Sequence, residues 1–248
     1  MKLEGKKALI VGASSGLGLE TAKLFASEGA EVAIVARNEA SLQKAAAEIG
    51  GDVTIIPTDV ADDAACETIV PNAVAKLGGL DVMVYCAGVI DLCPLEDMTV
   101  ESFRKHIDVN LTGNFIVARD AALHMKRSGG GNIVNVSSEL SHIGMGLCVH
   151  YCASKAGVVG LTQALAAEMA PTVRVNSVSP GPIDTPMLRA EIEWLGGTDE
   201  VLQGAIDRVP LKRFSRPAEV AKAVLFLAAD ADYATGSTLR LDGGTTAV

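Results

Sequence analysis

The chain has 248 residues, of which 49% are hydrophobic and 4% aromatic, so the core is expected to consist mainly of Ala, Val, Ile and Leu. This length is normal for one α/β domain with a sizeable core. The formal net charge of −9 excludes the basic surface typical of nucleic-acid-binding proteins, and the longest apolar stretches are too short for a membrane span.

Apolar runs of strand length alternate with segments of helical period along the whole chain. The predicted strands are Lys7–Val11, Glu31–Ala36, Asp52–Pro57, Asp81–Tyr85, Asn132–Val136, Arg174–Val178 and Thr238–Leu241. The predicted helices are Leu17–Ser27, Glu39–Ile49, about Asp62–Leu77, about Val100–Met125, Tyr151–Met169 and Pro217–Ala228. This order predicts a parallel sheet with helices on both faces.

Right-handed crossovers between such strands give an α/β, doubly wound (Rossmann) sheet of about seven strands. No linker-like stretch or internal repeat divides the chain, so residues 1–248 are predicted to form a single domain. Doubly wound sheets bind ligands beyond the carboxyl ends of their strands, at the switch point in strand order. The first, fourth, fifth and sixth strands end in unusual residues, which we expect to converge there.

A glycine-rich turn follows the first predicted strand. Its candidate cofactor-binding residues are Gly12, Ser14, Ser15, Gly16, Leu17 and Gly18. Backbone without side-chain obstruction, followed by a helix N-terminus, is suited to a pyrophosphate group. The GxxxGxG spacing differs from the usual GxGxxG fingerprint, so an ordinary glycine-rich turn is the alternative interpretation.

Tyr151 and Lys155 lie four residues apart in a predicted helix, so their side chains share one helix face. A free phenol titrates near pH ~10 and is a poor base at neutral pH. A neighbouring ammonium favours the phenolate and lowers that pKa. The pair therefore suggests acid–base chemistry, although a helix start with an unrelated lysine gives the same pattern.

Six motifs occur in a fixed order: GASSGLG, CAG at Cys86–Gly88, Asn110, VSS at Val136–Ser138, YCASK and PGPIDT at Pro180–Thr185. Together with the spacing between Ser138 and Tyr151, they resemble the short-chain dehydrogenase/reductase family over the whole chain. The resemblance implies an enzyme that interconverts a secondary alcohol and a ketone by hydride transfer with NADP(H) or NAD(H).

The resemblance also implies a role for each catalytic residue. Ser138, rather than Ser137, would hydrogen-bond the substrate oxygen, and Tyr151 would act as general acid and base. Lys155 would lower the pKa of Tyr151 and hold the nicotinamide ribose, and Asn110 would position a water that links Lys155 to solvent. The remaining implied cofactor contacts are Asp59 and Val60 at the adenine, Cys86, Ala87 and Gly88 after the fourth strand, and Pro180, Gly181, Ile183 and Thr185 at the nicotinamide.

Cys86 departs from the family pattern, which has Asn at this position. Cysteine packs there but supplies no amide hydrogen bonds, so we expect altered local bracing and retained activity. A redox-sensing role is the less favoured interpretation, because a small buried thiol is usually only a packing residue.

The residues at the end of the second predicted strand indicate whether NADP or NAD is the preferred cofactor. An acidic residue there would bind the adenosine ribose of NAD and repel a 2′-phosphate, but this chain has Ala36. Arg37 follows, and its guanidinium suits phosphate oxygens. We therefore expect NADP to be preferred, with NAD as the alternative. Ser15 argues against this expectation, since many NADP-preferring relatives have a basic residue at this position of the glycine-rich turn.

Residues 186–212 are predicted to form a lid over the substrate. The segment contains Met187, Leu188, Ile192, Trp194 and Leu195 before the pair Gly196-Gly197, and Met145 and Leu147 would form the opposite wall. Apolar residues beside a glycine pair suggest a mobile cover and a small apolar or cyclic ketone or alcohol as substrate. Glu139, next to Ser138, would disfavour anionic substrates unless it faces solvent.

Two other function classes compete with the dehydrogenase. A non-catalytic dinucleotide-binding sensor has no need for a proton donor, and a sugar-nucleotide epimerase usually needs a larger substrate domain. Small apolar residues on the helices at 100–125 and 151–169 suggest pairing into a homotetramer.

The histidines and cysteines predict no special site. His106, His124, His142 and His150 lack metal-ligand spacing, so no metal site is expected and they are placed on the surface or in loops, although His150 could touch substrate beside Tyr151. The five cysteines form no CxxC pair and no secretory leader is visible, which predicts reduced thiols in a cytoplasmic protein.

Overall fold

A seven-stranded parallel sheet forms the centre of the computed structural model, which describes residues 1–247. The strands are β1 (Lys7–Val11), β2 (Glu31–Ala36), β3 (Val53–Pro57), β4 (Val82–Tyr85), β5 (Gly131–Val136), β6 (Val173–Pro180) and β7 (Thr238–Leu241). Their order is β3-β2-β1-β4-β5-β6-β7, and every pair is parallel. The predicted doubly wound fold class is confirmed.

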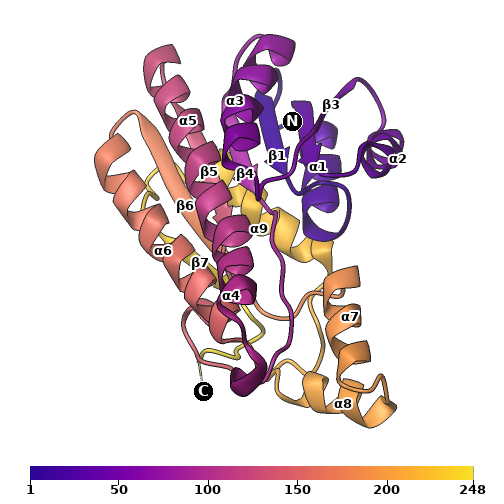
Figure 1. The fold of residues 1–248 in the computed structure, drawn as a ribbon. Coiled ribbons are helices and arrows are strands. Elements are labelled where there is room, and N and C mark those ends of the chain that lie inside the picture. Colours follow the sequence, from indigo (N-terminus) through magenta and orange to yellow (C-terminus); the bar gives the residue numbers. More distant parts are fainter. Residues whose placement is uncertain (248) are drawn as a thin grey trace.

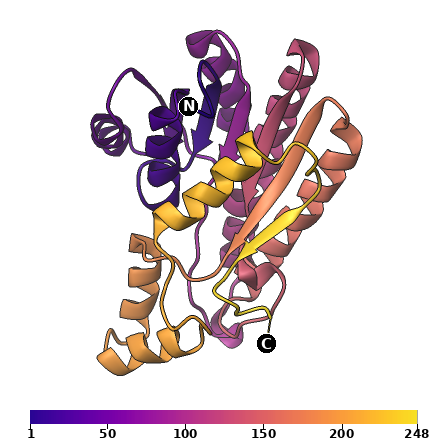
Figure 2. The ribbon, with the colours of Figure 1, turned by 180° about the vertical axis from the view of Figure 1, so that it is seen from behind.

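Helices cover both faces of the sheet (Figures 1 and 2). One layer contains α1 (Gly16–Ser27), α2 (Glu39–Ile49) and α9 (Pro217–Ala229), and the other contains α3 (Asp63–Leu77), α5 (Gly113–Ser128) and α6 (Val149–Met169). Because both faces are covered, β1 and β4 at the centre of the sheet are largely apolar, as in the buried run Ala8–Val11.

The strand order makes one end of the sheet the natural binding site. From β1 the chain winds first toward β3, and then returns to the other side of β1 at β4, so the order reverses between β1 and β4. The loops after β1, β4, β5 and β6 gather at this switch point. Near this end, α7 (Pro186–Trp194) and α8 (Asp199–Asp207) project from the sheet and its helices (Figure 1).

The predicted helix from Val100 to Met125 is interrupted in the structure. Its parts are α4 (Val100–Ile107), a π-helical segment at Asp108–Thr112, and α5, which ends at Ser128. In the π-helical segment, the Val109 carbonyl accepts a hydrogen bond of 2.8 Å from the Tyr85 hydroxyl on β4. Apolar periodicity cannot reveal this change, because it depends on bonds from a strand distant in sequence.

The expected surface position of two histidines is wrong. The helix at Tyr151 begins two residues earlier, at Val149, and His150 is fully buried against His106 of α4. The two rings stack with their centroids 3.6 Å apart. His150 therefore packs two helices together behind Tyr151, and it does not line the binding cleft.

The hydrogen bond between Tyr85 and Val109 generates a stability prediction. Tyr85→Phe keeps the ring in place but leaves the Val109 carbonyl without this donor in a buried environment. We expect a loss of about 1–3 kcal/mol in the free energy of unfolding, measured by urea denaturation. Tyr233→Phe is the matched control, because Tyr233 is fully exposed. An equal effect of both substitutions would contradict this role of Tyr85.

Candidate active site

A cleft of about 1250 Å³ opens at the switch point. Every residue predicted to contact the cofactor lines it, as do Ser138, Tyr151 and Lys155. Asn110 lies behind the wall and is fully buried. The volume exceeds that of a typical drug-sized pocket, so a dinucleotide and a small substrate can lie in it together.

The glycine turn leaves the N-terminus of α1 open toward the cleft. Ser15 precedes the helix, its side chain makes no capping bond, and the first helical turn contains no acidic residue. The first N–H groups of α1 are therefore available to an anion. This open helix end, lined by Ser14 to Gly18, fits the pyrophosphate of a dinucleotide.

Two of the glycines are required by the protein's own packing. A methyl group at Gly12 would lie 2.4 Å from the Ala87 nitrogen, and one at Gly18 would lie 2.1 Å from the Gly12 carbonyl oxygen. These glycines let β1, the loop after β4 and α1 approach one another closely. From the sequence alone, Gly12 and Gly18 were expected only to leave room for a phosphate group.

Ser138 lies at the end of β5 and is the serine available for chemistry. Its hydroxyl accepts a bond from the Leu140 N–H at 3.1 Å and also interacts with the Tyr151 hydroxyl. The Ser137 hydroxyl instead donates to the Lys155 carbonyl oxygen at 2.8 Å, away from the reacting pair. This geometry agrees with the choice of Ser138 over Ser137.

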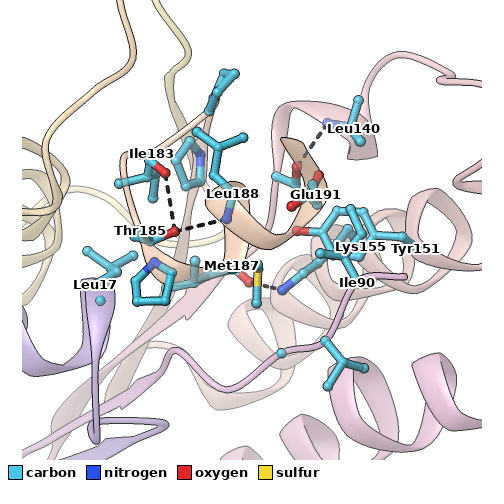
Figure 3. Close-up of a pocket in the computed structure, with 18 of the residues that line it drawn as sticks. Leu17, Ile90, Leu140, Tyr151, Lys155, Ile183, Thr185, Met187, Leu188 and Glu191 are labelled. Carbon is cyan, nitrogen blue, oxygen red and sulfur yellow. Dashed lines mark hydrogen bonds between the residues drawn. The ribbon is translucent and has the colours of Figure 1, made fainter. Parts of the chain in front are cut away.

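Tyr151 and Lys155 lie side by side on α6 (Figure 3). The Lys155 ammonium is 5.7 Å from the centre of the Tyr151 ring and donates to the Val136 carbonyl oxygen at 2.9 Å. Burial raises the pKa of Tyr151 well above its ordinary value, and the nearby Ser138 hydroxyl only partly opposes this. The expected lowering of the Tyr151 pKa by Lys155 is therefore not seen in the protein alone, where burial has the largest effect on this group.

The Asn110 amide joins the loop after β4 to α6. Its oxygen accepts a bond from the Val89 N–H at 2.8 Å, and its nitrogen donates to the Val89 carbonyl at 3.0 Å and to the Ser154 hydroxyl at 2.9 Å. A methyl group at Gly88 would lie 3.3 Å from the Asn110 oxygen and 3.4 Å from the Lys155 nitrogen. Asn110 thus fixes the backbone directly beside Lys155.

Cys86, which replaces the family's asparagine, is an unreactive thiol. Burial raises its pKa to about 12, so it stays protonated at neutral pH. The backbone after β4 is braced from Asn110 instead. These observations favour a packing role for Cys86 over redox sensing.

Two acidic residues line the cleft near Tyr151, one considered in the sequence analysis and one not. Glu139 is buried, contrary to the solvent-facing option, and burial raises its pKa to about 7. Glu191 of α7 lines the cleft near Tyr151, and burial also raises its pKa to about 7. Trp194 is exposed and does not line the cleft. A lone glutamate in an expected lid gave no signal that it would face the reacting residues.

Two negative findings concern the described residues 1–247. They contain no cluster of three or more His, Cys, Asp or Glu side chains that could hold a metal ion. Their helices also include none that combines the length and apolarity needed to cross a bilayer.

Comparison with known proteins identifies the family. A family model described as enoyl-(acyl carrier protein) reductase matches residues 12–246. The chain is 39% identical to cis-4-hydroxycyclohexanecarboxylate dehydrogenase of Sinomonas cyclohexanicum, over 97% of this chain and 96% of the relative. The structure of levodione reductase matches with a TM-score of 0.96 and 31% identity, covering 99% of both chains.

A third match contains a bound cofactor. A Beutenbergia cavernae structure, described as an NAD(P)-dependent gluconate 5-dehydrogenase with NADP at low occupancy, gives a TM-score of 0.93 and 33% identity, over 99% of this chain and 98% of that one. Fold and comparisons together define an NAD(P)-dependent oxidoreductase that acts on alcohol and carbonyl groups. The chain belongs to the short-chain dehydrogenase/reductase family, as the motifs predicted, and the sensor alternative is disfavoured.

The buried lysine generates a pH prediction. Burial lowers the pKa of Lys155 to about 8, from 10.5 for a free lysine. Between these values the unfolded chain binds more protons at this site than the folded chain, so Lys155 makes stability rise with pH over that window. In Lys155→Met this contribution should disappear, as measured by urea unfolding at pH 8 and pH 10. Identical pH dependence in both proteins would contradict a buried, destabilised ammonium.

Proposed function

We propose that this enzyme reduces a small ketone to a secondary alcohol, or catalyses the reverse reaction, with Tyr151 as acid and base. The observation that carries the proposal is the convergence of Ser138, Tyr151 and Lys155 on one cleft beside the open end of α1. The cofactor, when bound, supplies or accepts the hydride.

The protein's side chains orient the substrate and supply the proton that its oxygen receives in reduction. Ser138 and Tyr151 hydrogen-bond the substrate oxygen, and the Tyr151 hydroxyl gives its proton to that oxygen in reduction and takes it back in oxidation. Because burial raises the pKa of Tyr151, the phenol is protonated at neutral pH, which is the state that reduction needs. Lys155 holds the nicotinamide ribose, and Asn110 keeps Lys155 and the neighbouring backbone in position.

We infer that NADP is preferred over NAD. Ala36 ends β2 without an acceptor for the adenosine ribose, and exposed Arg37 lines the same part of the cleft. A guanidinium there forms charge-assisted bonds to a 2′-phosphate. Asp59 and Val60, after β3, would contact the adenine, and Pro180 to Thr185 would flank the nicotinamide.

Residues 186–212 are proposed as the lid of a single catalytic domain. Gly196 and Gly197 separate α7 from α8, and both have positive φ angles, of 114° and 64°. Such a hinge lets the two short helices close over the substrate. Leu188, Met145 and Leu147 line the cleft from opposite sides, which supports a small apolar or cyclic ketone over a sugar.

We also propose a homotetramer in the cytoplasm. Phe115 and Leu123 are exposed on α5, where a second copy of the chain could cover them. All five cysteines are free, which suits a reducing compartment.

The catalytic assignment is tested with a panel of ketones, alcohols and sugars and both cofactors, followed by nicotinamide absorbance. Tyr151→Phe should keep NADPH binding and lose most turnover, by roughly 10²–10⁴-fold. Tyr233→Phe, on the surface, is the control. Near-normal turnover in Tyr151→Phe would rule out its role, and a sugar with the highest kcat/KM would overturn the substrate class.

Cofactor preference is tested at the end of β2. Arg37→Ala should weaken NADPH binding by about ten- to a hundredfold and leave NADH binding unchanged, since a charged hydrogen bond contributes about 1.5–3 kcal/mol. Ala36→Asp should favour NADH. Lys44→Ala, which removes one positive charge from α2, is the control for net charge. A wild-type preference for NADH, or no change in Arg37→Ala, would refute this role of Arg37.

A further inference from the structure

One face of α7 lines the substrate end of the cleft and is apolar apart from one residue. Met187, Leu188 and Ile192 lie on this face together with Glu191. The other charged side chains of α7 lie off it: Arg189 is paired with Asp184 at 2.9 Å, and Glu193 is exposed. Glu191 is therefore the only charged group that α7 presents to the substrate.

The Glu191 carboxylate lies close to the reacting pair. Figure 3 shows it extending from α7 toward Tyr151, and its charge contributes to the raised pKa of that tyrosine. No hydrogen bond or ion pair to the Glu191 side chain is formed by the described residues 1–247, and the side chain is partly buried. An ionised group removed from water without a partner is costly, so packing alone would favour an apolar residue here.

The walls around Glu191 restrict the kind of ligand that fits. Ile90, Leu92, Leu140 and Ile143 line the same region and provide apolar contacts for a carbon frame. Glu139, the other acidic residue near Tyr151, follows β5 rather than lying on α7, and its buried Oε2 atom has no hydrogen-bond partner among the described residues. Glu191 is therefore the acceptor on the lid side of an otherwise apolar wall.

We propose that Glu191 accepts a hydrogen bond from a second hydroxyl group of the substrate, on a carbon next to the reacting one. The preferred substrates are then vicinal diols and the matching hydroxy ketones on an apolar frame. A carboxylate at that position is repelled by Glu191. A hydroxyl donates a hydrogen bond to Glu191 without bringing a second charge among the apolar residues of this wall.

This inference rests on the proposed dehydrogenase function and is tested by comparing cyclohexane-1,2-diol with cyclohexanol. The unchanged enzyme should have the higher kcat/KM for the diol. Glu191→Leu should lower kcat/KM for the diol by about ten- to a hundredfold, the value of a charged hydrogen bond, and leave cyclohexanol unchanged or improved. Glu191→Gln keeps the shape of the side chain but removes its charge, and should improve kcat/KM for 2-hydroxycyclohexanecarboxylate, which carries a carboxylate on the carbon next to the reacting one. Glu193→Gln, the same change off the cleft, should alter none of these values.

A binding measurement separates this inference from the dehydrogenase assignment. In Tyr151→Phe with NADP⁺, calorimetry should show that the diol binds at least tenfold more tightly than in the double variant with Glu191→Leu. Glu191-dependent binding without turnover in the unchanged enzyme would refute the proposed reaction and keep the role of Glu191. The inference would be overturned if the ratio of kcat/KM for the diol to kcat/KM for cyclohexanol were the same in the unchanged enzyme and in both Glu191 variants. A higher kcat/KM for 2-aminocyclohexanol than for the diol would also overturn it.

Discussion

The buried amide of Asn110 fixes the geometry on which the site depends. It bonds both backbone groups of Val89 and the hydroxyl of Ser154, and so holds the loop after β4 against α6. The π-helical segment gives Asn110 this position, and the Tyr85 hydroxyl anchors that segment to the sheet. Because Gly88 lies between Asn110 and Lys155 without a side chain, the amide sets the distance from the sheet edge to the lysine. The start of α6 is therefore positioned by polar contacts, in addition to the apolar packing that holds this helix and the rest of the fold.

Burial has opposite consequences for the ionisable groups of the cleft. It raises the pKa of Tyr151, keeps the Cys86 thiol protonated and lowers the pKa of Lys155 to about 8. Desolvation therefore favours the neutral form of each group, so that Tyr151 and Cys86 are protonated at neutral pH, whereas Lys155 remains mostly charged there. The overall charge of −9 opposes an anionic cofactor, so its phosphates depend on local donors, which the open end of α1 and Arg37 can provide. The cleft thus has an apolar end around Tyr151 and a more polar end at the N-terminus of α1.

The fold could be predicted closely from the sequence, because alternating apolar periods and glycine turns are local signals. The bounds of β1, β2, α2 and β7 agree with the prediction at every residue. The break in the long helix and the burial of His106 and His150 could not be predicted, since both depend on contacts between elements far apart in sequence. The predicted cofactor residues and three of the four predicted catalytic residues line one cleft, because most of their motifs follow strand ends that the parallel topology brings together. Glu191 could not be predicted, because only the three-dimensional placement of α7 shows that this residue lines the cleft near Tyr151.

The central claim is that this cleft transfers a hydride between a nicotinamide and the carbon of a carbonyl group. The most direct measurement is isotopic: the enzyme reduces a ketone with NADPH that carries deuterium in both positions at C4 of the nicotinamide, and the alcohol is analysed by mass spectrometry and NMR. The account predicts one deuterium in each product molecule, bound to the carbinol carbon, when the reaction is run in ordinary water. An alcohol without deuterium at that carbon, or with hydrogen taken from the solvent there, would contradict direct hydride transfer.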